Sequence, residues 1–298
     1  MMNFEEFLCY VEEHILKGWK ENAEVRIQET KKNNGITYQG LSIREMEEMV
    51  APCIYLEEFY DLYQRSGDLE EVMEKIRQEY QWAMERSALY EMNVLQYDRI
   101  RKKIIFRLVN YEKNREILED CPCIQMHDLA LTFRWVAHTD SIGISTALIT
   151  NRELALWGIS LHELLLVARE NTRRLFPPRI MDMDSFLMES GRGKPPLMPG
   201  KIMYIMTNEQ QINGATVLVY DGVLRQFADK IKEDFYVLPS SIHELILVPA
   251  SQFADAGRLF EMVREANDTI VLPVDYLSDS VYYYNRRKDQ LTLAASDA

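Results

Sequence analysis

The segment LPSSIHELILVP, residues 238–249, holds the side chains in this sequence whose types are best suited to catalysis. Ser241 could supply a nucleophile and His243 a general base, with Glu244 as a further candidate; such a pair needs a third group to orient the imidazole. Asn208, or alternatively Asn213, could join them at the edge of a sheet, where pockets form. These residues are the candidate catalytic set, and the reaction that they would support is hydrolysis.

The spacing of the same segment also fits a purely structural role. On a strand, Ser241 and His243 would share one face with Cβ atoms about 7 Å apart, beyond hydrogen-bond reach. The Gly-x-Ser-x-Gly elbow of many serine hydrolases does not accompany them. The alternative is a polar turn over residues 240–244 between two strands, with His243 bonded locally, and the spacing favours it.

A second group of residues has the right types to bind zinc. Cys121, Cys123, His127 and His138 are thiol and imidazole side chains within 18 residues of one another. A Cys-x-Cys pair followed by widely spaced histidines is not a recognised zinc spacing. These four are the candidate metal ligands, although the sequence predicts no bound metal. Phosphate-loop and dinucleotide motifs are both missing from the sequence, so no cofactor is expected.

The distribution of charge restricts the partners. The net charge is -13, and residues 1–100 carry 21 acidic and 11 basic side chains. Nonspecific nucleic-acid binding is therefore not expected, because phosphates need a positive field. The tyrosines 282–284, followed by basic residues 286–288, could stack on bases or dock a partner. In the alternative, two of the three tyrosines cover a sheet and the basic residues are solvated.

The first residues and the cysteine content indicate a soluble cytoplasmic protein. Residues 1–14 have the pattern of an amphipathic helix, without the basic start and apolar run of a signal peptide. The longest apolar stretches are far shorter than the 18 or so residues needed for a membrane helix. Four cysteines in 298 residues form no disulfide framework, so a reducing compartment is expected.

The fold class follows from the order of the expected elements. Alternating apolar and polar residues on either side of Asn34-Gly35 predict a hairpin of strands at 24–31 and 36–43, followed by long acidic helices. The later strands are expected near residues 103–109, 125–149, 203–206, 215–220, 235–238 and 244–248. Helices are expected after Ser160, where Glu163 completes a capping box, at 222–231 and at 253–266. This mixture predicts an α+β fold.

Two parts are expected along the chain, although they could form one continuous domain. The first, residues 1–120, is the acidic hairpin with its helices, and the second, residues 121–298, is a mixed sheet region. Five of the ten prolines lie between Phe176 and Gly200. Residues 177–200 are therefore expected to be a linker or excursion from the second part.

Several short motifs, taken together and in order, resemble one family over nearly the whole chain. They are NNGITYQGLSIRE, APCIYLEEFYDLY, RLVNYEKN, ITNRELALWGIS, ENTRRLFP, TNEQQINGA, LPSSIHELILVP and LSDSVYYYNR. The family is a bacterial domain of unknown function, number 5688 of that series. The resemblance implies a soluble bacterial protein and assigns no activity, substrate, cofactor or catalytic residue.

Without a convincing catalytic set, the sequence predicts a non-enzymatic cytoplasmic binding or adaptor protein. Its partner would be an unidentified protein or small molecule, with no membrane involved. The alternative function is a hydrolase-like enzyme that uses the polar turn from Ser240 to Glu244. Whether the chain is an enzyme stays open at this point.

Overall fold

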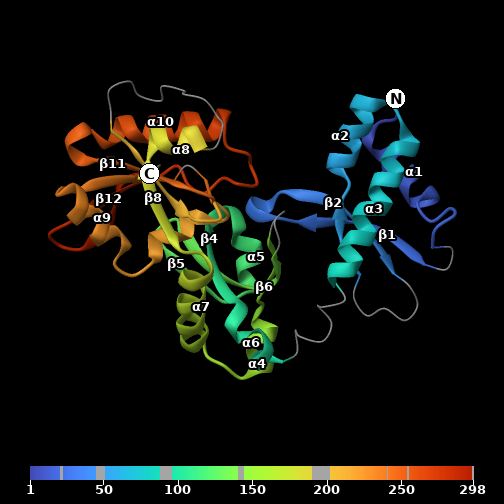
Figure 1. Ribbon diagram of the computed structural model, residues 1–298, viewed down its shortest axis with the longest axis horizontal. Coiled ribbons are helices and arrows are strands. Elements are labelled where there is room, and N and C mark those ends of the chain that lie inside the picture. The colour runs from blue at the N-terminus through green and yellow to red at the C-terminus, as the bar shows by residue number, and fades with distance from the viewer. Residues whose placement is uncertain are drawn as a thin grey trace. The chain divides into compact units, whose positions relative to one another are not determined.

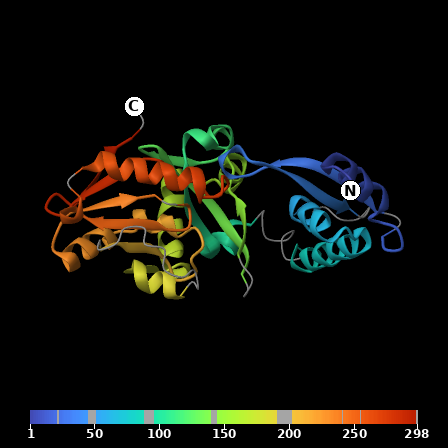
Figure 2. The ribbon, with the colours of Figure 1, turned by 90° about the horizontal axis from the view of Figure 1, so that it is seen from above.

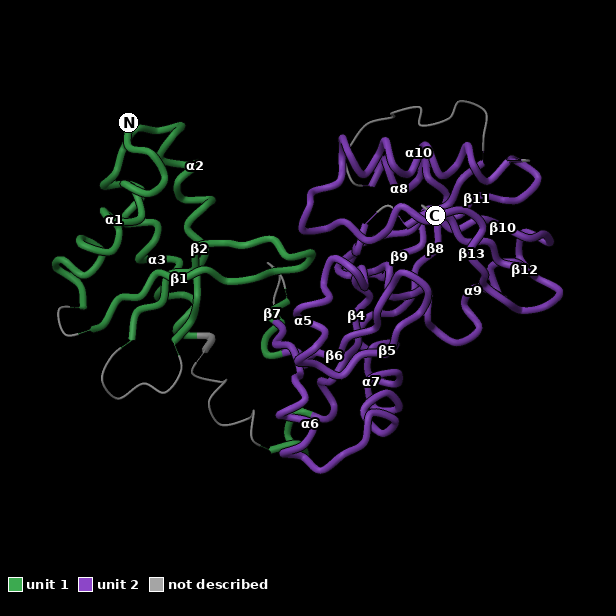
Figure 3. The backbone as a smooth tube through the Cα atoms, turned by 180° about the vertical axis from the view of Figure 1, so that it is seen from behind, with its two compact units in different colours: residues 1–100, 137–145 green, residues 101–136, 146–298 purple. Residues whose placement is uncertain are grey.

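The computed structural model describes residues 1–20, 23–44, 51–87, 96–139, 144–189, 202–239, 241–253 and 255–296. Its contacts divide the chain into two compact units, coloured separately in Figure 3. The first unit contains residues 1–100 and 137–145, and the second contains residues 101–136 and 146–298. The fold class is α+β, as the sequence predicts, and the sheets are antiparallel.

The first unit is a small sheet with helices (Figure 1). Its elements are α1 (Phe4–His14), β1 (Glu24–Lys31), β2 (Thr37–Arg44), β3 (Ile54–Tyr55), α2 (Glu57–Ser66), α3 (Leu69–Ser87) and α4 (Tyr97–Ile100). The predicted hairpin is confirmed: β1 pairs with β2 along eight residues, and the turn places Asn34 and Gly35 at φ of 61° and 69°. Both residue types tolerate this left-handed conformation, which explains why the hairpin turns here.

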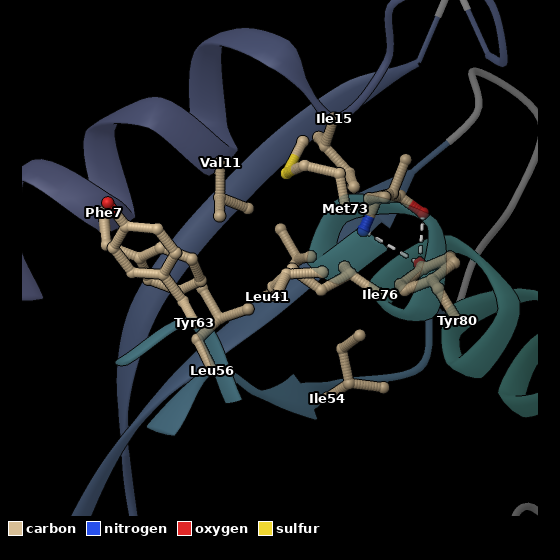
Figure 4. Packing of buried hydrophobic residues seen from close by; sticks show 12 residues of the cluster. Phe7, Val11, Ile15, Leu41, Ile54, Leu56, Tyr63, Met73, Ile76 and Tyr80 are labelled. Carbon is tan, nitrogen blue, oxygen red and sulfur yellow. Dashed lines mark hydrogen bonds between the residues drawn. The ribbon is translucent and has the colours of Figure 1, made fainter. Parts of the chain in front are cut away.

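The core of this unit lies between the sheet and its helices, as Figure 4 shows. Phe7 and Val11 from α1 pack against Leu41 of β2, and Ile76 and Tyr80 come from α3. All five side chains are fully buried. Spacings of three and four residues put the apolar positions of each helix on one face, so the acidic residues between them face solvent.

The second unit contains two sheets (Figure 1). The four-stranded sheet has the order β4-β6-β5, with β7 paired to β6. Its strands are β4 (Ile104–Asn110), β5 (Cys123–Met126), β6 (Leu129–Thr139) and β7 (Ile144–Leu148), and α5 (Arg115–Glu119), α6 (Asn151–Trp157) and α7 (Leu161–Leu175) belong to the same region. β4 pairs with β6 along its whole length, and residues 101–120 lie in the second unit.

The six-stranded sheet has the order β13-β12-β10-β11-β9-β8. Its strands are β8 (Pro178–Asp182), β9 (Tyr204–Asn208), β10 (Phe235–Leu238), β11 (Leu245–Pro249), β12 (Val281–Asn285) and β13 (Gln290–Ala295). Helices α8 (Met183–Glu189) and α10 (Ala256–Thr269) pack on one face through a shared apolar cluster. Helix α9 (Val223–Ile231) covers the other face, where Phe227 contacts Tyr204 and Phe235. In Figure 2, α10 runs alongside the orange strands of this sheet.

One local expectation from the sequence is wrong. Residues 215–220 do not form a strand, because Gly214–Val219 is a 3-10 helix. Consecutive residues from Gly214 to Leu218 are all buried, so the alternation of a half-buried strand is lost. Part of the proline-rich excursion 177–200 is regular structure, since β8 and α8 lie within it. Pro178 is tolerated because it is the first residue of an edge strand; residues 190–200 lie outside the described residues.

Other predicted elements are confirmed close to their expected bounds. Helix α7 begins with the predicted capping box, in which the Ser160 hydroxyl accepts the Glu163 N–H and the Glu163 carboxylate accepts the Ser160 N–H. This reciprocal bonding satisfies two backbone donors that a helix start would otherwise leave free. None of the helices in the described ranges is long and apolar enough to cross a membrane.

Candidate functional site

The candidate catalytic residues lie in a turn between β10 and β11, here called the histidine turn (residues 241–244). The Ser241 N–H bonds to the Glu244 carbonyl, and the Ser241 hydroxyl accepts the N–H of His243 at 3.0 Å. A serine hydroxyl that accepts a backbone N–H two residues later is a common turn-forming contact. The histidine turn is therefore polar and not a strand, while Ser240 lies outside the described residues.

The ring of His243 has a partner at each nitrogen. Nδ1 accepts the N–H of Asn213 at 3.2 Å, and Nε2 lies 3.3 Å from Oδ1 of Asp275. Because Nδ1 accepts a hydrogen bond, the neutral ring carries its proton on Nε2 and donates it to the carboxylate. The side chains of His243 and Asp275 are 33% and 26% exposed, so the pair is partly screened by solvent.

The histidine turn is attached to the end of β9. The Thr207 hydroxyl donates to the His243 carbonyl at 2.7 Å. Gly214 packs so closely here that a Cβ atom would lie 2.0 Å from the Thr207 hydroxyl and 2.3 Å from the His243 carbonyl. Only glycine allows this approach of two backbone segments. The turn is thus held by its neighbours in a single position.

The side chain of Asn208 is hydrogen-bonded to the loop that follows β9. It is 1% exposed, and its amide donates to the Ile212 carbonyl at 2.8 Å while its carbonyl accepts the Ile212 N–H at 3.2 Å. Both ends of the amide are therefore bonded within the loop after β9. Glu244 contributes its backbone carbonyl to the histidine turn, and the carboxylate that faces the imidazole is Asp275 instead.

The four candidate metal ligands are not assembled into a site. Within the described ranges, no group of three or more His, Cys, Asp or Glu residues could hold a metal ion. Cys121 and Cys123 are close neighbours in the second unit, where burial, followed by Cys123, raises the pKa of the Cys121 thiol to about 11. His127 lies in the turn between β5 and β6 with its ring against Tyr282, and His138 lies near the end of β6.

Two arginines that no motif identifies lie on neighbouring strands of the four-stranded sheet. Arg107 is on β4 and Arg134 is on β6. The Nε atom of Arg107 is buried without a hydrogen-bond partner. Burial and the charge of Arg134 lower the pKa of Arg107 to about 9, and Asp275 acts weakly in the opposite direction. The sequence signal was a lone charge inside an apolar strand, in IIFRLVN and again in LTFRWVA.

A third polar cluster surrounds Asp128, in the turn between β5 and β6. Its carboxylate accepts hydrogen bonds from the hydroxyls of Ser278, Ser280 and Tyr282. Burial, and then the charge of Asp128, raise the pKa of Tyr282 above its ordinary range. This cluster fastens the four-stranded sheet to the start of β12. Each of the three hydroxyls donates a hydrogen bond to the Asp128 carboxylate, so the cluster has a structural role.

The tyrosine run is part of the core of the six-stranded sheet. Tyr282 and Tyr284 are buried, with their hydroxyls bonded to Asp128 and Asp289. The prediction that two of the three tyrosines cover the sheet is confirmed. Arg286 bonds to Asp229 at 2.8 Å, so this basic residue is engaged within the unit. The rings of the two buried tyrosines are therefore not available to stack on bases.

Comparison with known proteins gives a family and no activity. The model of a family of unknown function, DUF5688, matches residues 4–286. The chain belongs to this family. Neither the curated proteins nor the solved structures include a match to the chain. The family match covers residues of both units of the chain.

Proposed function

We propose that this member of the DUF5688 family is a cytoplasmic binding or adaptor protein and not a hydrolase. The observation that carries the proposal is the bonding of the His243 ring, whose Nδ1 accepts a backbone N–H and whose Nε2 faces Asp275. A general base for a serine nucleophile needs one ring nitrogen directed at the hydroxyl. With both nitrogens engaged, the imidazole links two loops and supports a structural role.

The remaining candidate groups support the same conclusion. The Ser241 hydroxyl is turned to the backbone of the histidine turn, and the Asn208 amide is bonded at both ends. The cysteines are free thiols, which agrees with a reducing compartment such as the cytoplasm. A binding protein needs no activated nucleophile, and buried polar groups without partners give it places for a ligand. The partner is a protein or a small molecule.

The proposal is tested by two measurements on the full chain. Native mass spectrometry of protein purified gently from its host should detect a retained partner or small molecule. A panel of ester, amide and phosphoester substrates should give no turnover that depends on His243. His162, an exposed residue on α7, provides the matched control. Turnover abolished by His243→Ala and preserved in His162→Ala would overturn the proposal.

A further inference from the structure

Arg107 and Arg134 project from the same face of the four-stranded sheet. In the register of β4 and β6, Arg107 lies opposite Thr132 and Arg134 lies opposite Ile105. Residues opposite each other in an antiparallel pair share a face, and so do residues two apart on one strand. Cys123 of β5 is also opposite Thr132. These four residues, Arg107, Thr132, Arg134 and Cys123, are called the arginine face.

The alternate residues of both strands form apolar core on the other side of the sheet. Phe106 lies opposite Phe133 and Leu108 lies opposite Leu131, and all four are buried. The ring of Phe106 also contacts Tyr220. The polar groups of these strands are thus concentrated on the arginine face. Arg107, Arg134 and Cys123 are each partly exposed there.

The two guanidinium groups are held differently. Arg134 is anchored by Thr146 of β7, whose hydroxyl accepts from Nε at 2.7 Å and whose carbonyl accepts from a terminal nitrogen at 3.2 Å. Arg107 has neither an ion pair nor a side-chain hydrogen bond to any residue in the described ranges. One arginine is therefore fixed by the sheet, while the donors of the other are unused.

The charge of Arg107 has no ion-pair partner among the residues that the structure describes. Asp275 is the acidic group that acts on Arg107, and its Oδ1 atom faces the His243 ring. The thiols of Cys121 and Cys123 have raised pKa values, so they stay neutral near pH 7 and supply no negative charge. Two like charges that are partly removed from water repel each other, and burying a guanidinium without a partner is costly.

An oxyanion would remove this cost. The guanidinium presents its N–H donors in a planar fork, which fits two oxygens of a carboxylate or a phosphate group. We propose that the arginine face binds a small oxyanion, the phosphate or carboxylate group of a small molecule, through the donors of Arg107 with Arg134 as the second positive charge. This inference rests on the proposed function, because it supplies a ligand class for the binding protein.

Binding is measured on the full chain by isothermal titration calorimetry with inorganic phosphate and, separately, acetate, at an ionic strength held constant with sodium chloride. Hydrogen bonds to charged groups contribute roughly 1.5–3 kcal/mol, so Arg107→Gln should weaken binding of the preferred anion about 10- to 100-fold. Arg115→Gln, which removes an exposed guanidinium from the same unit, should leave the affinity unchanged. Asp275→Asn removes the nearby negative charge and should strengthen binding.

A spectroscopic measurement keeps the test independent of whether Arg107→Gln folds. The Nε–H resonance of Arg107, assigned by its loss in Arg107→Lys, should shift when phosphate or acetate is added to the wild-type protein. Absence of binding for both anions, or equal binding by wild type and Arg107→Gln, would overturn the inference. If a protein partner is then retained in the native spectrum, the proposed function survives this failure. Turnover dependent on His243 would instead refute the proposed function and leave the anion site standing.

Discussion

The substitution Tyr80→Phe tests how the first unit completes its sheet. Tyr80 is fully buried on α3, and its hydroxyl accepts the N–H of Ile43 at 2.8 Å and donates to the carbonyl of the same residue. In an antiparallel strand, the N–H and carbonyl of one residue point to the same side. On that side of β2, the short β3 pairs only with Gly40 and Leu41. The tyrosine hydroxyl therefore satisfies two backbone groups that the sheet leaves unpaired (Figure 4).

The magnitude follows from the two groups that Tyr80→Phe leaves buried without partners. Each unsatisfied buried group costs about 1–3 kcal/mol, and part of this is recovered when the site relaxes. We expect a loss of about 2–4 kcal/mol in the free energy of unfolding of the first unit. If exchange proceeds through opening of this unit, such a loss accelerates amide hydrogen exchange about 30- to 700-fold.

Hydrogen exchange followed by mass spectrometry separates the two units within one chain. Peptides from β1 and β2 should lose protection in Tyr80→Phe, while peptides from β9, β10 and β11 should exchange as in the wild type and act as the internal control. Tyr63→Phe is the matched variant, because among the described residues its hydroxyl bonds only to the N–H of Met2. A loss below about 1 kcal/mol for Tyr80→Phe, or an equal loss in both variants, would refute the reasoning.

Three further outcomes follow from the structure. Gly214→Ala should lower the free energy of unfolding by about 3 kcal/mol or more, since its Cβ would lie under 3 Å from backbone atoms. In the control Gly67→Ala, the Cβ has open space, so only the positive φ is unfavourable and the loss should be about 1 kcal/mol. Thermal denaturation of the two variants measures the difference. Ser160→Ala should cost α7 about 0.5–2 kcal/mol in urea denaturation, and an unchanged midpoint would contradict the capping box. Burial, followed by the hydrogen bond to Asp234, raises the pKa of Tyr283 from 10.0 to about 12. The stabilising contribution of Tyr283 is therefore complete below pH 10 and is lost as the pH rises towards 12. A melting temperature that does not fall between pH 10 and 12 would contradict this prediction.

Elements that depend on neighbours in sequence were predictable. The hairpin at Asn34-Gly35 and the capping box at Ser160 and Glu163 were both identified, because positive φ and helix capping are decided within four residues. The polar turn after β10 was the favoured interpretation of its segment. The α+β class followed from the alternation of such local elements, which needs no knowledge of which strands pair.

Contacts between distant segments were not predictable from one sequence. Asp275 faces His243 across 32 residues, and no local spacing announces this pair. The residues from Gly214 to Val219 are rich in strand-forming types, yet their burial on all sides makes them a 3-10 helix, since tertiary packing overrides weak local propensity.

The arginine face depends both on the sequence and on the pairing of its strands. The sequence by itself determined that Arg107 and Arg134 are lone charges within apolar strands. Only the register of β4 on β6 decided that both side chains share a face, because a shift of one residue would turn one of them to the opposite side. That register is set by the packing of the whole sheet. A local motif therefore cannot show that the positive charges of Arg107 and Arg134 lie on the same face of the sheet.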